Sequence, residues 1–212
     1  MRKIAFSLIS LLLILTATAE EKIRIACVGD SITFGAGVEN RKENNYPLQL
    51  EKILGEKYQV INCGVSGRTL LKKGDHPIWK EKAYQKAKDF KPNIVVIKLG
   101  TNDTKPQNWK YKDEFKSDLI SMVKDFQSLE SKPAVYLCKP VPVYQSRWGI
   151  NEEGVVKGVI PIVEEVAKEL NLEVIDLYTA LSNKPKMFPD KIHPNAAGAK
   201  VMAETVAKAV KK

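Results

Sequence analysis

Short runs of apolar, often β-branched residues alternate along this chain with longer segments in which apolar residues recur every three or four positions. Apolar runs of this kind are typical of strands in a parallel sheet that helices cover on both faces. The pattern predicts five buried strands, near residues 23–28, 58–63, 94–99, 134–138 and 173–176.

Helical periodicity fills the intervals between these runs. The clearest case is segment 112–129, where Phe115, Leu119 and Met122 begin a series of apolar residues on one helix face. Strands that alternate with helices are joined by right-handed crossovers, so the sequence predicts an α/β fold, a doubly wound three-layer sandwich. Functional groups in such a fold gather at the carboxyl ends of the strands. Further helices are predicted at residues 46–54, 83–90, 159–170 and 195–210.

The N-terminus has the order of features found in a secretory signal peptide. Met1-Arg2-Lys3 precedes the uncharged residues 4–15, and Ala17-Thr18-Ala19 follows them. A run of about a dozen apolar residues is too short to cross a bilayer as a helix. We therefore predict a signal peptide at residues 1–19 and an exported protein, periplasmic or extracellular, whose residues 20–212 form a single domain without a membrane span.

The chain is basic, with 34 Lys and Arg residues against 25 Asp and Glu residues and a formal net charge of +9. The lysines are spread along amphipathic segments such as 80–88, as on solvated helix faces, and form no basic tract. Zinc-finger spacing and RNA-binding aromatic motifs are both missing from the sequence, so nucleic acid is not a predicted partner.

Cysteine and histidine are too few and too scattered for a disulfide scaffold or a metal site. Cys27, Cys63 and Cys138 each lie in a predicted buried strand, and the chain has only two histidines. Buried free thiols are therefore predicted, with a Cys27–Cys63 bridge as the open alternative. No cofactor is predicted either, because Gly35-Ala36-Gly37 lacks the third glycine of a dinucleotide-binding turn.

A serine follows the first predicted strand, and an acid and an imidazole lie three residues apart near the other end of the chain. Ser31 would be the nucleophile, His193 its base and Asp190 the group that orients the imidazole. The negative charge on the attacked carbonyl oxygen would be held by the backbone N–H groups of Ser31 and Gly64 and by the side-chain amide of Asn102. This set of residue types predicts a serine hydrolase.

Four ordered segments carry a family resemblance: Gly29-Asp30-Ser31, residues 62–67, Gly100-Thr101-Asn102-Asp103 and Asp190-Lys191-Ile192-His193. Together they resemble the four signature blocks of the SGNH, or GDSL-type, hydrolases, with Ile32 where the name motif has leucine. The resemblance implies a flavodoxin-like α/β/α sandwich with a five-stranded parallel sheet. It also implies cofactor-independent ester hydrolysis through an acyl-serine intermediate, with the same roles for Ser31, Gly64, Asn102, Asp190 and His193.

A weaker resemblance concerns the substrate. Residues 98–109 look like the branch often described as sialate O-acetylesterase-like or acetylxylan-esterase-like, which removes acetyl groups from sugars. The predicted partner is therefore an acetylated glycan or another acylated small molecule. The connection 139–158 is long enough to form a substrate-binding loop. Candidate substrate-binding residues, which would otherwise only pack the loop edges, are Asp30, Arg68, Trp79, Trp109, Tyr144 and Trp148.

Other interpretations stay open at this point. Each segment alone has an ordinary reading as a helix cap or turn, and only their joint occurrence favours catalysis. Ser66 is a rival nucleophile in a turn that contains Gly67, but it lacks the spacing of a nucleophile elbow and is predicted to shape the loop. A lysophospholipase or thioesterase would use the same catalytic residues on longer acyl chains. A secreted carbohydrate-binding protein without turnover is the alternative from a different functional class.

Overall fold

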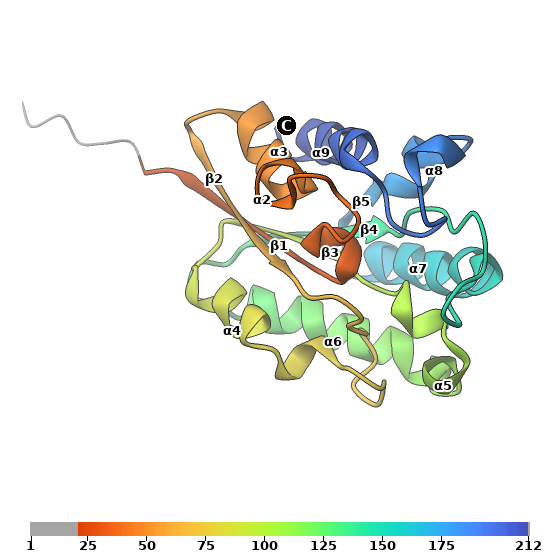
Figure 1. Cartoon of the computed structure of the whole chain (residues 1–212). Coiled ribbons are helices and arrows are strands. Elements are labelled where there is room, and N and C mark those ends of the chain that lie inside the picture. The colour runs from red at the N-terminus through yellow and green to blue at the C-terminus, as the bar shows by residue number, and fades with distance from the viewer. Residues whose placement is uncertain (1–20, 212) are drawn as a thin grey trace, which may run out of the picture.

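The central sheet of the computed structural model, which describes residues 21–211, contains five strands, all parallel, in the order β2-β1-β3-β4-β5 (Figure 1). The strands are β1 (Ile23–Gly29), β2 (Tyr58–Gly64), β3 (Ile94–Lys98), β4 (Ala134–Lys139) and β5 (Glu173–Asp176). The predicted α/β fold and its parallel sheet are confirmed. The predicted signal peptide, residues 1–19, lies outside the described residues.

The strand order places three strand ends side by side. Gly29 of β1 is in register with Gly64 of β2 on one side and with Lys98 of β3 on the other. The winding direction reverses between β1 and β3, because the chain returns past β1 after forming β2. Connections that leave the sheet at such a reversal diverge to opposite faces, which opens a crevice at the carboxyl edge.

Helices cover both faces of the sheet (Figure 1). On one face, α3 (Tyr46–Leu54), α8 (Leu177–Leu181) and α9 (Ala196–Val210) contribute to a buried cluster around Ile25, Cys27 and Val96. On the other face, α4 (Lys82–Asp89), α6 (Phe115–Gln127) and α7 (Ile160–Leu170) pack on Ala26, Val28 and Val95. Consecutive residues of β1 thus enter opposite cores, as the near-continuous apolar runs predict.

Short helical segments shape the carboxyl edge and the loops. They are α1 (Ser31–Phe34), α2 (Arg41–Asn44), α5 (Pro106–Trp109), the 3-10 turns η1 (Ile78–Lys80), η2 (Asn102–Thr104), η3 (Lys112–Glu114) and η5 (Pro185–Met187), and the π-helical segment η4 (Gly154–Val159). The predicted helix at 112–129 is divided, since η3 precedes α6. The last helix begins at Ala196, because Asn195 caps it by accepting the Gly198 N–H at 3.0 Å.

All three cysteines are buried free thiols, so the alternative of a Cys27–Cys63 bridge is wrong. Burial raises the pKa of Cys63 to about 11 and that of Cys138 to about 12, so both thiols stay protonated at neutral pH. None of the helices within residues 21–211 has the length and hydropathy that crossing a membrane requires.

Candidate active site

Ser31 is the first residue of α1, directly after β1. Asp30 caps this helix, with its Oδ1 accepting the Ile32 N–H at 2.9 Å, and Gly35 ends it after one turn with φ of +90°. Gly29 allows the close approach of β3 at this point, because a Cβ there would lie 2.6 Å from the Lys98 carbonyl oxygen. The turn holds Ser31 at the edge of the sheet, where its hydroxyl is accessible from one side.

Asp190 and His193 lie in the segment that precedes α9, and the fold brings them to Ser31. His193 Nε2 is 2.8 Å from Ser31 Oγ, and His193 Nδ1 is 2.7 Å from Asp190 Oδ2. The other Asp190 oxygen accepts the backbone N–H groups of Ile192 at 3.0 Å and His193 at 2.7 Å. These hydrogen bonds orient the carboxylate, the carboxylate orients the imidazole, and the imidazole can take the serine proton.

The electrostatics of this segment favour an ionised Asp190. Partial burial raises the pKa of Asp190, but the N–H donors of the His193 backbone, the His193 ring and the Ile192 backbone outweigh it, so the pKa lies below its ordinary value. The carboxylate therefore keeps its charge throughout the range in which an ordinary imidazole titrates, about pH 6.5. A charged Asp190 holds the proton on Nδ1 and leaves Nε2 as the acceptor.

A small cavity of about 220 Å³ opens beside the Ser31 hydroxyl; it is called the catalytic cavity below. Asn102, the first residue of η2, reaches it from the end of β3, and one hydrogen of its amide is directed to the Arg68 carbonyl at 3.2 Å. The second hydrogen has no acceptor among residues 21–211, and the same holds for the Ser31 backbone N–H. The lining residues are Ser31, Ala36, Ser66, Gly67, Asn102, Lys105, Trp148, Ile150 and His193.

Gly64 does not serve as an oxyanion donor in this structure, and that prediction is corrected. Its N–H donates to Asn62 Oδ1 at 2.9 Å, and Gly64 is buried beneath α1, where a Cβ would lie 2.6 Å from the Thr33 carbonyl carbon. The glycine therefore serves close packing between β2 and α1. It does not line the catalytic cavity.

The Gly67 backbone N–H is positioned for the oxyanion-donor role that the sequence analysis assigned to Gly64. It lines the catalytic cavity, its φ of +80° lies in the left-handed region, and a Cβ would meet nothing within 4 Å. No acceptor for the Gly67 N–H is found within residues 21–211. The sequence signal that could have identified it is the second glycine of the segment 62–67, which lies beyond the strand end and so is free of sheet hydrogen bonds.

Two charged residues predicted near the substrate have structural partners instead. Asp30 is 0 % exposed and pairs with Lys98 Nζ at 3.0 Å, so it lies beneath the turn and cannot meet a substrate. Arg68 donates from its guanidinium to Glu81 at 2.8 Å and to the Ser66 carbonyl at 2.7 Å. These bonds stabilise the loop that contains Gly67, and the Arg68 side chain does not line the catalytic cavity.

Two predicted aromatic platforms are also packing residues. Trp79 donates its ring N–H to the Leu70 carbonyl at 2.7 Å and packs on Tyr84 with 5.3 Å between ring centroids. Tyr144 packs on Phe188 at 5.0 Å, and its hydroxyl donates to the Leu181 carbonyl at 2.6 Å. Neither ring lines the catalytic cavity, so both assignments to substrate binding are corrected.

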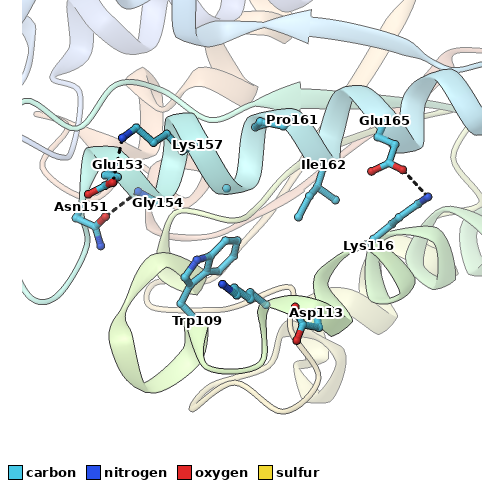
Figure 2. A pocket seen from close by; sticks show the side chains of 12 residues that line it. Trp109, Asp113, Lys116, Asn151, Glu153, Gly154, Lys157, Pro161, Ile162 and Glu165 are labelled. Atoms are coloured by element: carbon cyan, nitrogen blue, oxygen red, sulfur yellow. Dashed lines mark hydrogen bonds and ion pairs between the residues drawn. The ribbon is translucent and has the colours of Figure 1, made fainter.

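Trp109 lines a different, larger groove of about 610 Å³ (Figure 2). Its indole packs on Phe115 at 5.8 Å and lies against Gly158 of the π-helical segment. Lysine and glutamate side chains form ion pairs around the groove, such as Lys116 with Glu165 at 2.8 Å (Figure 2). The groove and the catalytic cavity have no lining residue in common, which separates Trp109 from the reacting groups.

Trp148 is the predicted aromatic residue that the fold does bring to Ser31. It is 55 % exposed, and its ring centroid lies 5.9 Å from that of His193. Its φ of +54° is unusual for a bulky residue, and a backbone bridge between Arg147 and Ile150 closes the turn around it. A large exposed ring, held in a strained backbone, therefore lies beside the reacting groups.

Buried polar residues near Asn102 keep the loops of the cavity together, and these supports were not predicted. Asp103 is fully buried and accepts the N–H groups of Leu70 at 3.1 Å and Leu71 at 2.8 Å. Asn108 is also fully buried and donates to the Asn102 carbonyl at 2.9 Å. They fix the loop after β2, which carries Gly67, against the loop after β3.

Two curated proteins are similar to this chain in sequence. The chain is 45% identical over 213 residues to an acetylxylan esterase from Xylanibacter ruminicola, with 92% of this chain and 44% of that protein covered. It is 24% identical to a multidomain esterase from Ruminococcus flavefaciens, with 89% of this chain and 28% of that protein covered. The chain thus spans less than half the length of these curated relatives.

Solved structures share the fold. Est24, a carbohydrate acetylesterase from Sinorhizobium meliloti, superimposes with a TM-score of 0.74 at 20% identity, over 90% of this chain and 99% of that one. The native aryl esterase of M. smegmatis gives a TM-score of 0.69 at 21% identity, over 89% and 98%. The model of the GDSL-like lipase/acylhydrolase family matches residues 27–201, most of the chain. Because this match covers more than half of the chain, the chain belongs to the GDSL-like lipase/acylhydrolase family.

Proposed function

We propose that this protein is an exported serine esterase that removes acetyl groups from acetylated carbohydrates. The observation that carries the proposal is the continuous chain of hydrogen bonds from Asp190 through His193 to the Ser31 hydroxyl, at 2.7 and 2.8 Å. The acetylxylan esterase relative supports an acetylated glycan as substrate, and the N-terminal pattern of residues 1–19 supports export.

The reaction follows from the positions of these groups. Ser31 Oγ attacks the acetyl carbonyl carbon while His193 Nε2 takes its proton. The carbonyl oxygen becomes negative and accepts hydrogen bonds from the Asn102 side-chain amide and from the backbone N–H groups of Ser31 and Gly67. The bond to the sugar oxygen then breaks, that oxygen takes the proton from His193, and the acetyl group stays on Ser31. Water, deprotonated by His193, releases acetate and restores the serine.

The dimensions of the catalytic cavity favour a short acyl group. Its volume of about 220 Å³ is below the range of about 300 to 1,000 Å³ that is usual for larger ligands. A long-chain lipase or thioesterase would need a longer apolar channel than a cavity of this volume provides.

The direct test is acetate release from a panel of acetylated xylan, pectin and sialic acids, beside acetyl, butyryl and octanoyl esters of one alcohol. We expect release from at least one acetylated glycan and a rate that falls as the acyl chain lengthens. Faster hydrolysis of the octanoyl ester would favour the lysophospholipase or thioesterase alternative. Tight glycan binding without any acetate release would favour a carbohydrate-binding protein.

Asn102→Ala should lower kcat by about 10² to 10³ while KM changes little, because the lost amide stabilises charge that develops only in the transition state. Steady-state kinetics on a soluble acetyl ester measure both constants. Asn108→Ala is the comparison, since it removes a support of the same loop and leaves the Asn102 amide in place. A kcat of Asn102→Ala within about threefold of wild type would remove Asn102 from the oxyanion hole.

Trp148→Ala should raise KM for an acetylated xylo-oligosaccharide about fivefold, because stacking on an exposed ring is worth on the order of 1 kcal/mol. The KM for a small acetyl ester without a sugar should stay within about twofold. Trp109→Phe serves as control, since Trp109 lines the separate groove. An equal rise in KM for both substrates, or an equal effect of Trp109→Phe, would show that Trp148 does not recognise the sugar.

A further inference from the structure

A fully buried lysine lies beneath the turn that carries Ser31. Lys98 ends β3, in register with Gly29, and its side chain is 0 % exposed. Its Nζ is 3.1 and 3.0 Å from the two oxygens of Asp30 and 2.7 Å from Thr101 Oγ1. An ammonium has three N–H donors, and these three acceptors satisfy all of them.

The acceptors belong to two different turns of the carboxyl edge. Asp30 Oδ1 also accepts the Ile32 N–H at 2.9 Å, so the carboxylate that binds Lys98 is the group that begins the helix of Ser31. Thr101 directly precedes Asn102, and its carbonyl accepts the Thr104 hydroxyl at 2.8 Å. One ammonium therefore connects the turn of the nucleophile with the turn of the amide donor.

Stability alone gives no reason for a charge in this place. Taking an ammonium and a carboxylate out of water costs several kcal/mol for each ion, and a well-packed apolar pair of similar size is often as stable or more stable. The strands around Lys98 are otherwise lined by apolar residues such as Val95, Val96 and Ile97. What an apolar pair would lack is a directional connection between the two turns.

We propose that Lys98 is a positioning residue, whose ammonium holds Ser31 and Asn102 at the separation that one acyl group requires. The inference rests on the proposed function, because it assumes that both residues act on the same carbonyl: Ser31 Oγ on its carbon and the Asn102 amide on its oxygen. A misplacement of about 1 Å in such a set costs on the order of 10² in rate.

Lys98→Met removes the ammonium and keeps the length of the side chain. We expect kcat on a soluble acetyl ester to fall about 100-fold while KM stays within about threefold. Thr101→Val keeps the ion pair between Lys98 and Asp30 and removes only the hydrogen bond from Lys98 to the turn of Asn102. This variant should lower kcat about tenfold. Ser31 labelling by a fluorophosphonate probe should slow in parallel with kcat for Lys98→Met.

The double variant Lys98→Met with Asp30→Asn separates positioning from stability. It removes both charges, and the Asn oxygen can still accept the Ile32 N–H, so we expect a melting temperature above that of Lys98→Met, which leaves the Asp30 carboxylate buried without its partner. Its kcat should nevertheless stay at least about 30-fold below wild type. Recovery of kcat together with the melting temperature would overturn the proposal, because a purely structural pair would then explain Lys98. So would a normal kcat in Lys98→Met.

Lys139→Met is the matched control. Lys139 ends the adjacent strand β4, and its Nζ lies 3.2 Å from Asp176, but that pair touches neither catalytic turn. Its kcat should stay within about threefold of wild type. The labelling rate of Ser31 tests Lys98 without any sugar substrate. Failure of the glycan assignment would appear as missing acetate release with normal labelling of the wild type, whereas failure of the Lys98 inference would appear as unchanged labelling in Lys98→Met.

Discussion

Ser31→Ala should lower kcat for ester hydrolysis by about 10⁴ to 10⁶, because among residues 21–211 the Ser31 hydroxyl is the one that is hydrogen-bonded to the His193 imidazole. Ser31 is a cap-adjacent residue with one hydrogen bond from its side chain, so the variant should keep its melting temperature. Loss of acetate release at an unchanged melting temperature, measured on the same preparation, is the expected result.

Ser66→Ala provides the matched control for this experiment. Ser66 lines the same cavity and follows the next strand, but its hydroxyl is not hydrogen-bonded to the imidazole. Its kcat should stay within about threefold of wild type, since only the serine that contacts a base is activated. If Ser66→Ala loses hydrolysis and Ser31→Ala keeps it, the nucleophile has been assigned to the wrong turn.

Asp190→Asn should lower kcat by about 10⁴ with little change in the fold. The asparagine oxygen would keep the bonds to the backbone N–H groups of Ile192 and His193, so its NH₂ group would face His193 Nδ1. The ring would then have to accept at Nδ1 and carry its proton on Nε2. An imidazole in that tautomer cannot take the proton from Ser31.

The pH dependence of kcat/KM tests whether Asp190 stays charged while it orients the imidazole. Because the pKa of Asp190 lies below its ordinary value, the carboxylate should remain ionised as the pH falls toward the ordinary carboxylate range, so protonation of Asp190 should not limit kcat/KM of wild type above that range. Asp176→Asn is the control: Asp176 also accepts a backbone N–H, from Thr179 at 2.8 Å, but has no imidazole partner. An equal loss in that variant would contradict the tautomer argument.

The strands could be predicted from the sequence because the hydrophobic pattern and the fold depend on the same fact, burial on both faces. Each predicted strand agrees with the structure to within about a residue or two. The triad geometry was within reach of a sequence argument as well, since residues just after parallel strands share one edge, and Asp190 and His193 are close in sequence.

The remaining site residues could not be predicted, because their roles depend on hydrogen bonds and packing partners that a sequence pattern does not show. Gly64 and Gly67 are both glycines after β2, and only the bond from the Gly64 N–H to Asn62 shows which of the two remains available. Trp79, Tyr144 and Trp148 are all aromatic residues in or near loops, yet the first two are partly buried and pack against the core. In the sequence, Lys98 is one residue of a predicted strand. Its buried ammonium binds Asp30, which lies 68 positions away in the chain, so the sequence pattern gave no sign of this contact.

The connection from β4 to α7, which carries Trp148 to the rim of the catalytic cavity, is also hydrogen-bonded to both catalytic loops. The Tyr144 N–H donates to the Lys191 carbonyl at 2.9 Å, and the Asn151 side-chain amide donates to the Thr104 carbonyl at 3.0 Å. A loop graft that exchanges the whole connection would therefore remove supports of the imidazole and of the amide donor together with the substrate contact. Point substitutions that spare both bonds are the narrower route to a changed substrate preference.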